Sequence, residues 1–195
     1  MSSTRPLSFV RRGFALVSAC LALTAPIVSG CGGGEAAGPG AASPGGGGVA
    51  KVGSPAPDFS AEFIGGEGPK TLKDASGKVV VVDFWATFCG PCKKSFPAYQ
   101  KLVDQFGGEL TIIAISVDEP DNATKEQIAD FAKTTGAKFT VLWDKAGEIR
   151  GKKYEVPTMP TSYIIDKGGV VRHVHAGYED GEDAKVAEEV KALLK

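Results

Sequence analysis

"VDFWATFCGPCKK", residues 82–94, carries two cysteines, Cys89 and Cys92, that are separated only by Gly90 and Pro91. The stretch continues a run of four valines, a pattern typical of a strand that is buried on both faces of a parallel sheet. A structural disulfide stabilises more when it closes a longer loop, and a structural zinc site needs two further ligands. The cysteine pair therefore favours a third interpretation, which is redox chemistry.

The expected position of the pair, at a turn from strand to helix, suits that chemistry. The free N–H groups and the dipole of a helix N-terminus stabilise a thiolate, so we expect Cys89 to be the nucleophile, with a lowered pKa. Cys92 lies one helical turn further on and can attack the resulting mixed disulfide. Asp83 sits in the apolar strand, where poor solvation raises a carboxyl pKa, and it can accept the proton of Cys92. The alternative is a structural carboxylate bonded to a nearby backbone amide.

The hydrophobic pattern predicts alternating strands and helices. Strands are expected over 78–86, 110–118, 139–144, 161–166 and 170–175, and helices over 91–108, 123–136 and 181–195. Pro97 predicts a kink in the first helix. Lys167, Gly168 and Gly169 predict a hairpin between the last two strands. This order predicts an α/β fold in which helices flank a central mixed sheet.

The first 30 residues do not read as part of that fold. A basic start precedes an apolar stretch, 14–30, that is short for a membrane span, so residues 1–30 are predicted to be a signal peptide. "VSGC", residues 28–31, resembles a bacterial lipoprotein signal, which implies cleavage before Cys31 and a diacylglyceryl group on its sulfur. The alternative is an ordinary signal that leaves Cys31 as a free thiol. "RRGF", residues 11–14, fits a twin-arginine signal poorly and is taken as part of a plain basic start.

The next segment is a predicted tether. Residues 31–50 are rich in Gly, Ala and Pro and cannot bury a core, whereas residues 51–195 have the composition of one globular domain. Of four cysteines, Cys20 would leave with the signal and Cys31 would be acylated, as the lipoprotein resemblance implies, so only the tight pair would remain. An exported protein could hold a disulfide framework, and this one has only that pair.

Charge and histidine content exclude other classes of function. The formal net charge is -1 and the basic residues are scattered, so we expect no nucleic-acid partner. His173 and His175 lie on one face of a strand and could in principle complete a zinc site with the cysteines. The simpler interpretation is a polar, half-exposed edge strand, and we expect no metal.

Several segments together resemble a known family. Residues 82–94 are similar to the thioredoxin active-site segment, with its aspartate, tryptophan and Gly-Pro in place. The wider chain resembles the membrane-anchored thioredoxin-like proteins of the TlpA/ResA type, in "VGSPAPDFSAEFIGG" (52–66), "LKDASGKVVVVDFWATFCGPC" (72–92), "ISVDE" (115–119) and "VPTMPTSYIID" (156–166). The resemblance covers residues 51–195 and implies a thioredoxin-like fold.

The resemblance also implies a substrate-binding surface beside the cysteines. In the family a cis proline faces the dithiol, and Pro160 matches it, with Met159 presenting its backbone to the substrate chain. Trp85 would flank the same surface, together with Gly90 and Pro91.

Two positions depart from the reducing members of the family. They often carry asparagine where this chain has Asp83, and glutamate where it has Ser95. We therefore expect Asp83 to take over the proton-transfer role. The acidic G-x-P-E stretch of dedicated cytochrome-maturation members is also missing, which weakens an assignment of apocytochrome c as the substrate.

These observations predict a thiol–disulfide oxidoreductase that works mainly as a reductase through Cys89 and Cys92. The resemblance implies a monomer that is lipid-anchored at Cys31 on the periplasmic side of a bacterial membrane. It would need no cofactor, reduce disulfides of exported proteins, and be recharged by a membrane thiol-transfer protein.

Three alternatives remain at the level of sequence. A periplasmic dithiol oxidase or isomerase would use the same cysteines. A peroxidase shares the fold, but peroxiredoxins carry threonine and proline where this chain has Ala86 and Val82. A lipid-tethered binding module would use the disulfide only as a brace, and the buried carboxylate of Asp83 argues against it, since such a group costs stability.

Overall fold

The computed structural model of the chain describes residues 47–195. The predicted signal peptide (1–30), the lipidation site Cys31 and the tether up to residue 46 lie outside the described residues. The elements, in chain order, are β1 (Glu62–Gly65), β2 (Val79–Trp85), α1 (Cys92–Phe106), the short η1 (Gly107–Glu109), β3 (Leu110–Ser116), α2 (Lys125–Thr134), β4 (Thr140–Trp143), the π-helix η2 (Ile149–Tyr154), β5 (Thr161–Ile165), β6 (Val171–Ala176) and α3 (Glu182–Leu194).

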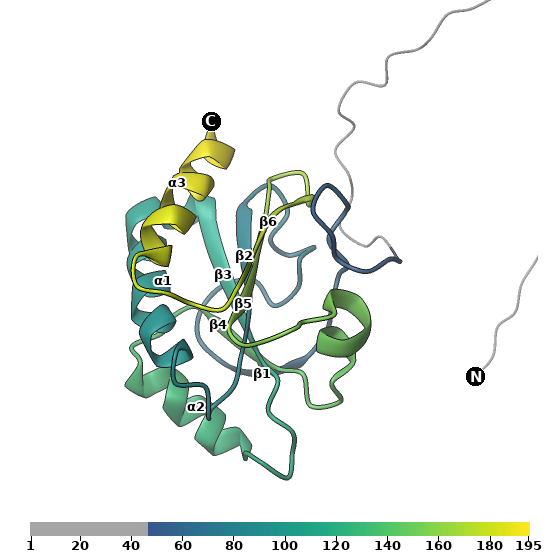
Figure 1. Cartoon of the computed structure of the whole chain (residues 1–195), viewed down its shortest axis with the longest axis vertical. Helices are drawn as coiled ribbons and strands as arrows, with labels where there is room; N and C mark the ends of the chain where they lie inside the picture. The colour runs from purple at the N-terminus through teal and green to yellow at the C-terminus, as the bar shows by residue number, and fades with distance from the viewer. Residues whose placement is uncertain (1–46) are drawn as a thin grey trace, which may run out of the picture. The chain divides into compact units, whose positions relative to one another are not determined.

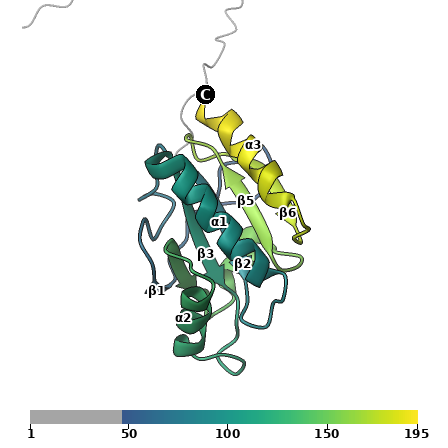
Figure 2. The ribbon, with the colours of Figure 1, turned by 90° about the vertical axis from the view of Figure 1, so that its left-hand side faces the viewer.

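One sheet of six strands forms the centre, in the order β1-β4-β3-β2-β5-β6. The pairs β2–β3 and β3–β4 are parallel, whereas β1, β5 and β6 join antiparallel. The parallel pairs are linked by crossovers that contain α1 and α2, as parallel strands require. The predicted mixed sheet flanked by helices is confirmed, and Figure 2 shows α1 and α3 lying across it.

Two layers cover the sheet. Figure 1 shows α1, α2 and α3 on one side and η2 on the other. Every residue of β2 is buried, and successive side chains of a strand point to opposite faces. Phe84 packs on Tyr154 of η2, with ring centroids 5.0 Å apart, and Trp85 packs on Phe96 of α1 at 4.8 Å. Asp83, which has the parity of Trp85, therefore faces α1.

The expected elements match the observed ones closely, with two omissions. Neither β1 nor η2 was predicted. β1 has only four residues and is half exposed at an edge of the sheet, so it shows no clear alternation. The sequence of η2, "IRGKKY", combines a glycine with three basic residues and buries only Ile149 and Tyr154. The helix α1 continues through Pro97.

The edge strand β6 departs from the expectation of a half-exposed surface. His175 is buried, and its two ring nitrogens lie 2.6 Å from carboxylate oxygens of Glu182 and Glu189 on α3. His173 stays half exposed, 3.4 Å from Glu189. The histidines thus tie β6 to α3, because the last helix covers this face of the edge strand. Residues 47–195 contain no cluster of His, Cys, Asp or Glu that could hold a metal ion.

Ala50, the last residue of the predicted tether, takes part in the folded domain. The Ala50 N–H donates to the Lys153 carbonyl at 2.8 Å, and the Ala50 side chain is buried. Packing therefore includes the last residue of the predicted tether. Across residues 47–195, we find no helix with the length and apolarity needed to span a membrane.

Candidate active site

The two cysteines form a disulfide at the start of α1. Their Cα atoms are 5.3 Å apart, and Cys92 is the first residue of the helix after the N-cap Pro91. The Cys92 N–H donates to Sγ of Cys89 at 3.2 Å, so the helix N-terminus points at the Cys89 sulfur, as predicted. Cys89 is 6% exposed and Cys92 is fully buried. Cys89 is therefore the sulfur that a partner can reach first.

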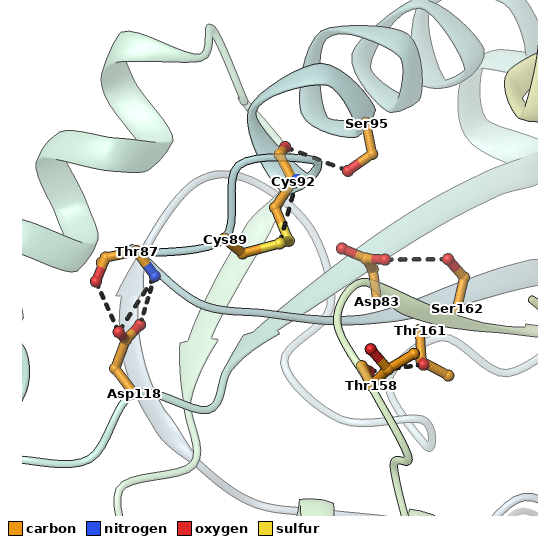
Figure 3. Close-up of a disulfide and its surroundings, with 9 residues drawn as sticks. All are labelled: Asp83, Thr87, Cys89, Cys92, Ser95, Asp118, Thr158, Thr161 and Ser162. Atoms are coloured by element: carbon orange, nitrogen blue, oxygen red, sulfur yellow. Dashed lines mark hydrogen bonds between the residues drawn. A yellow bond between two sulfur atoms is a disulfide. The ribbon is translucent and has the colours of Figure 1, made fainter. Parts of the chain in front are cut away.

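A buried aspartate fixes the loop before Cys89. Asp118 accepts hydrogen bonds from the Thr87 N–H at 3.0 Å, the Thr87 hydroxyl at 2.7 Å and the Ser116 hydroxyl at 2.8 Å. Figure 3 shows the contact with Thr87 beside the disulfide. β2 and β3 are parallel and end together, so Asp118, just after β3, lies next to the loop after β2. Sequence reasoning missed this role, although an aspartate directly after a buried strand was a signal.

Asp83 is completely buried beneath the pair. Its Oδ1 accepts a hydrogen bond from the Ser162 hydroxyl at 3.0 Å, and its Oδ2 has no hydrogen-bond partner among the described residues. In Figure 3 the second oxygen lies on the side of the disulfide. Burial raises the pKa of Asp83 to about 8, against the opposing effect of the Ser162 hydrogen bond. The alternative of a carboxylate bonded to a backbone amide does not describe this site, since the partner is a hydroxyl.

A second hydroxyl follows behind Ser162. The Tyr99 hydroxyl lies 2.5 Å from Oγ of Ser162, and both side chains are buried. Burial raises the pKa of Tyr99 well above its usual value, so the phenol stays protonated. Sequence reasoning named neither residue, because Ser162 lies 79 positions from Asp83 and 63 from Tyr99. In the sequence, Tyr99 belongs to the apolar face of a predicted helix and Ser162 to a predicted strand, so both looked like ordinary structural positions.

The turn before β5 contains the expected cis bond. The peptide between Met159 and Pro160 is cis, and the Thr161 hydroxyl donates to the Thr158 carbonyl at 2.8 Å in the same turn. Thr161 pairs with Phe84 in the register of β5 against β2. The turn before β5 therefore lies at the same end of the strands as the loop after β2, which carries the cysteines. Met159 is partly exposed there, while Pro160 is buried.

The remaining predicted substrate-binding residues divide by exposure. Gly90 and Pro91 are exposed. Trp85, in contrast, has no exposed surface and packs between Phe96 and Phe131. Its indole therefore lies in the core below the active-site loop and does not form part of the exposed surface. An aromatic residue that sequence reasoning passed over, Phe88, is 66% exposed directly before Cys89.

Comparisons with known proteins agree with this geometry. The AhpC/TSA family profile matches residues 52–174. The chain is 38% identical over 125 residues to the thioredoxin-like protein YneN of Bacillus subtilis, covering 64% of this chain and 71% of that protein. It is 42% identical over 123 residues to the thiol-disulfide oxidoreductase ResA of Bacillus thuringiensis, covering 62% and 67%.

A solved structure extends the similarity to the fold. A thiol:disulfide interchange protein of the thioredoxin family from Chlorobium tepidum superposes with a TM-score of 0.61 at 27% identity, covering 73% of this chain and 97% of that one. The disulfide at the start of α1, the mixed sheet and the relatives thus point to the same class of protein.

Proposed function

This chain belongs to the AhpC/TSA family and is a thiol-disulfide oxidoreductase of thioredoxin fold, and we propose that it works as a reductase of disulfides in exported proteins. The observation that carries this direction is the buried Asp83 beside the pair. A strongly oxidising couple needs a stabilised reduced form. In the fraction of molecules in which Asp83 is ionised, its charge disfavours further negative charge on the reduced pair, so the disulfide form gains relative stability.

The proposed cycle begins with the more accessible sulfur. The Cys89 thiolate attacks a substrate disulfide, which forms a mixed disulfide and releases the first substrate sulfur as a thiolate. Asp83 then takes the proton of Cys92, and the Cys92 thiolate attacks Sγ of Cys89. The Cys89–Cys92 bond forms, the bond to the substrate breaks, and the second substrate thiolate leaves and takes up a proton. Two electrons pass from the dithiol to the substrate, so no cofactor is needed.

The proposed surface for the substrate chain surrounds this step. Gly90 and Pro91 are exposed beside Cys89. The partly exposed Met159 precedes the cis Pro160 at the same end of the strands. An extended segment of the partner could use the backbone of Met159 there. The oxidised pair would afterwards be recharged by a membrane thiol-transfer protein.

The proposed location is the outer side of a bacterial membrane. "VSGC" at 28–31 supports cleavage before Cys31 and lipidation of its sulfur, and residues 31–50 would serve as the tether for a monomeric domain. Mass spectrometry of the N-terminal peptide tests this directly. We expect a diacylglyceryl-modified Cys31, and release of the Cys31→Ser protein into the soluble fraction.

The reduction potential of the pair is the decisive measurement. The protein is equilibrated against glutathione and dithiothreitol buffers, and the reduced fraction is measured by alkylation of the active-site peptide. The reduction potential should be about -270 mV, as for thioredoxin. A value near about -120 mV, typical of strong oxidants, would overturn the reductase assignment in favour of an oxidase or isomerase.

Partner trapping separates catalysis from simple binding. The Cys92→Ser protein should accumulate mixed disulfides through Cys89, because the resolving sulfur is gone, whereas Cys89→Ser should not. Absence of trapped species from both variants would favour the binding module. The parent protein with both cysteines reduced should leave hydrogen peroxide unconsumed, since a peroxidase would consume it.

A further inference from the structure

Two polar side chains are linked to Asp83 in series: Ser162 bonds to its Oδ1, and Tyr99 bonds to Ser162. We propose that Ser162 and Tyr99 are positioning residues for proton transfer, and that they hold one oxygen of Asp83 so that the other receives the proton of Cys92. The proposal rests on the proposed role of Asp83 as the base. It assigns a function to two residues that do not touch the reacting sulfurs.

The geometry determines which group donates in each of the two hydrogen bonds that link Tyr99, Ser162 and Asp83. Ser162 has a single hydroxyl proton, and it points that proton at Oδ1 of Asp83, 3.0 Å away. Oγ of Ser162 must therefore accept the 2.5 Å bond from the Tyr99 hydroxyl. The raised pKa of Tyr99 keeps the phenol protonated as a donor. The chain of donors thus runs from Tyr99 through Ser162 to Asp83.

This arrangement leaves the two carboxylate oxygens unequal. Oδ1 is held by Ser162, whereas Oδ2 has no partner among residues 47–195 and lies on the side of the disulfide in Figure 3. A hydrogen bond to the charged form stabilises that form. Ser162 therefore opposes the effect of burial on Asp83. Without it, more of the carboxyl would stay protonated at neutral pH and be unable to accept a proton.

The three residues also come from three different elements. Asp83 on β2 and Ser162 on β5 are direct partners in the strand register, so their side chains share the face that α1 covers. Tyr99 follows Cys92 by seven residues in α1, which is two helical turns and places both on one helix face. The helix α1 therefore carries both the attacking sulfur of Cys92 and Tyr99, the first donor in the series of hydrogen bonds to Asp83.

The test measures the resolving step alone. The reduced full-length protein, with Cys20 and Cys31 replaced by serine, is mixed with an aromatic disulfide reagent that releases a coloured thiolate. The first release reports attack by Cys89, and the second reports attack by Cys92 on the mixed disulfide. The rate of the second release is followed across the pH range in stopped flow.

Removal of either hydroxyl should shift this profile to higher pH. We expect Ser162→Ala to slow the second release at neutral pH by about tenfold or more, since it removes a hydrogen bond to a charged acceptor. Tyr99→Phe should shift it in the same direction by about threefold, because it acts through Ser162. Ser162→Thr keeps a hydroxyl and should restore the profile. Tyr163→Phe removes a buried hydroxyl that donates to the Tyr154 carbonyl on the opposite face, and it should leave the profile unchanged.

The outcomes distinguish the positioning role of Ser162 and Tyr99 from the proposed role of Asp83 as the base. If Asp83→Asn abolishes the pH step while Ser162→Ala and Tyr99→Phe superimpose on the parent protein, the positioning role is refuted and the base survives. If Asp83→Asn leaves the profile unchanged, the proposed base itself is refuted. An equal shift in Tyr163→Phe would also refute the proposal, because it would reduce the effect to a general loss of core hydroxyls.

Discussion

Replacement of Asp83 by asparagine should remove a large pH dependence from the stability of the oxidised protein. Burial raises the pKa of Asp83 from 3.8 to about 8 in the folded chain. Below pH 3.8 both the folded and unfolded states are protonated. As the pH rises toward 8 only the unfolded state loses its proton, so the free energy of unfolding falls. Above 8 the penalty stays constant.

The magnitude follows from the size of the shift. One pKa unit corresponds to about 1.4 kcal/mol, so this residue alone should lower the free energy of unfolding by about 4 kcal/mol between pH 4 and 7. Asparagine preserves the acceptor for Ser162 and cannot ionise. The exchange of one oxygen for an amide group changes the local hydrogen bonding equally at every pH, so it does not alter the slope.

The assay is therefore a comparison of slopes. Guanidinium unfolding of the oxidised parent protein and of Asp83→Asn, repeated between pH 4 and 9, gives the difference in unfolding free energy at each pH. All other ionisable groups are common to both proteins, so this difference isolates Asp83. Relative to the parent protein, the unfolding free energy of Asp83→Asn should rise by about 4 kcal/mol between pH 4 and 7. Parallel curves, within about 1 kcal/mol, would refute a buried carboxyl with a raised pKa.

Three further substitutions probe the surroundings of the pair. Asp118→Ala should destabilise the protein by about 1–3 kcal/mol in denaturant unfolding, because it strips the bonds that fix the loop before the cysteines; Glu119→Ala, which removes an exposed neighbour, should change little. His175→Ala should cost about 2 kcal/mol by the same measurement, since it leaves two glutamates without their shared partner, and His173→Ala less than about 1 kcal/mol. Phe88→Ala should change the free energy of unfolding by less than about 0.5 kcal/mol. If the exposed ring helps to dock a protein substrate, the substitution should slow reduction of a protein disulfide about tenfold and leave reduction of a small aromatic disulfide unchanged. Equal effects on both substrates would contradict that docking role.

The sequence was sufficient for most of the fold because the strong signals were local. Continuous apolar runs predicted β2 and β3, and the two-glycine turn predicted the antiparallel pairing of β5 with β6. The omissions, β1 and η2, are elements held by tertiary contacts. β1 is fixed by pairing with β4. In η2 the buried Tyr154 packs on Phe84, which is remote in sequence, and on Tyr163 of the following strand.

The site divides in the same way. Cys89, Cys92 and Asp83 lie within ten residues of one another, so a linear motif could carry all three. Ser162 and Asp118 meet that motif only after the sheet has formed, because β5 and β3 flank β2 on its two sides. A serine or an aspartate at the end of a strand is compatible with many local structures. Only the register of the sheet gives these two residues their hydrogen-bond partners and hence a place in the site.

The polar groups around Asp83 are distributed in a way that stability alone does not explain. An apolar residue at this position, surrounded by a buried strand, would avoid the desolvation cost altogether. Ser162 and Tyr99 offset part of that cost, yet their hydrogen bonds reach only one oxygen. The oxygen that remains without a partner among the described residues is the one on the side of the disulfide. This unequal arrangement suits the proposed role of Asp83 as a base, because the second oxygen is free to accept a proton.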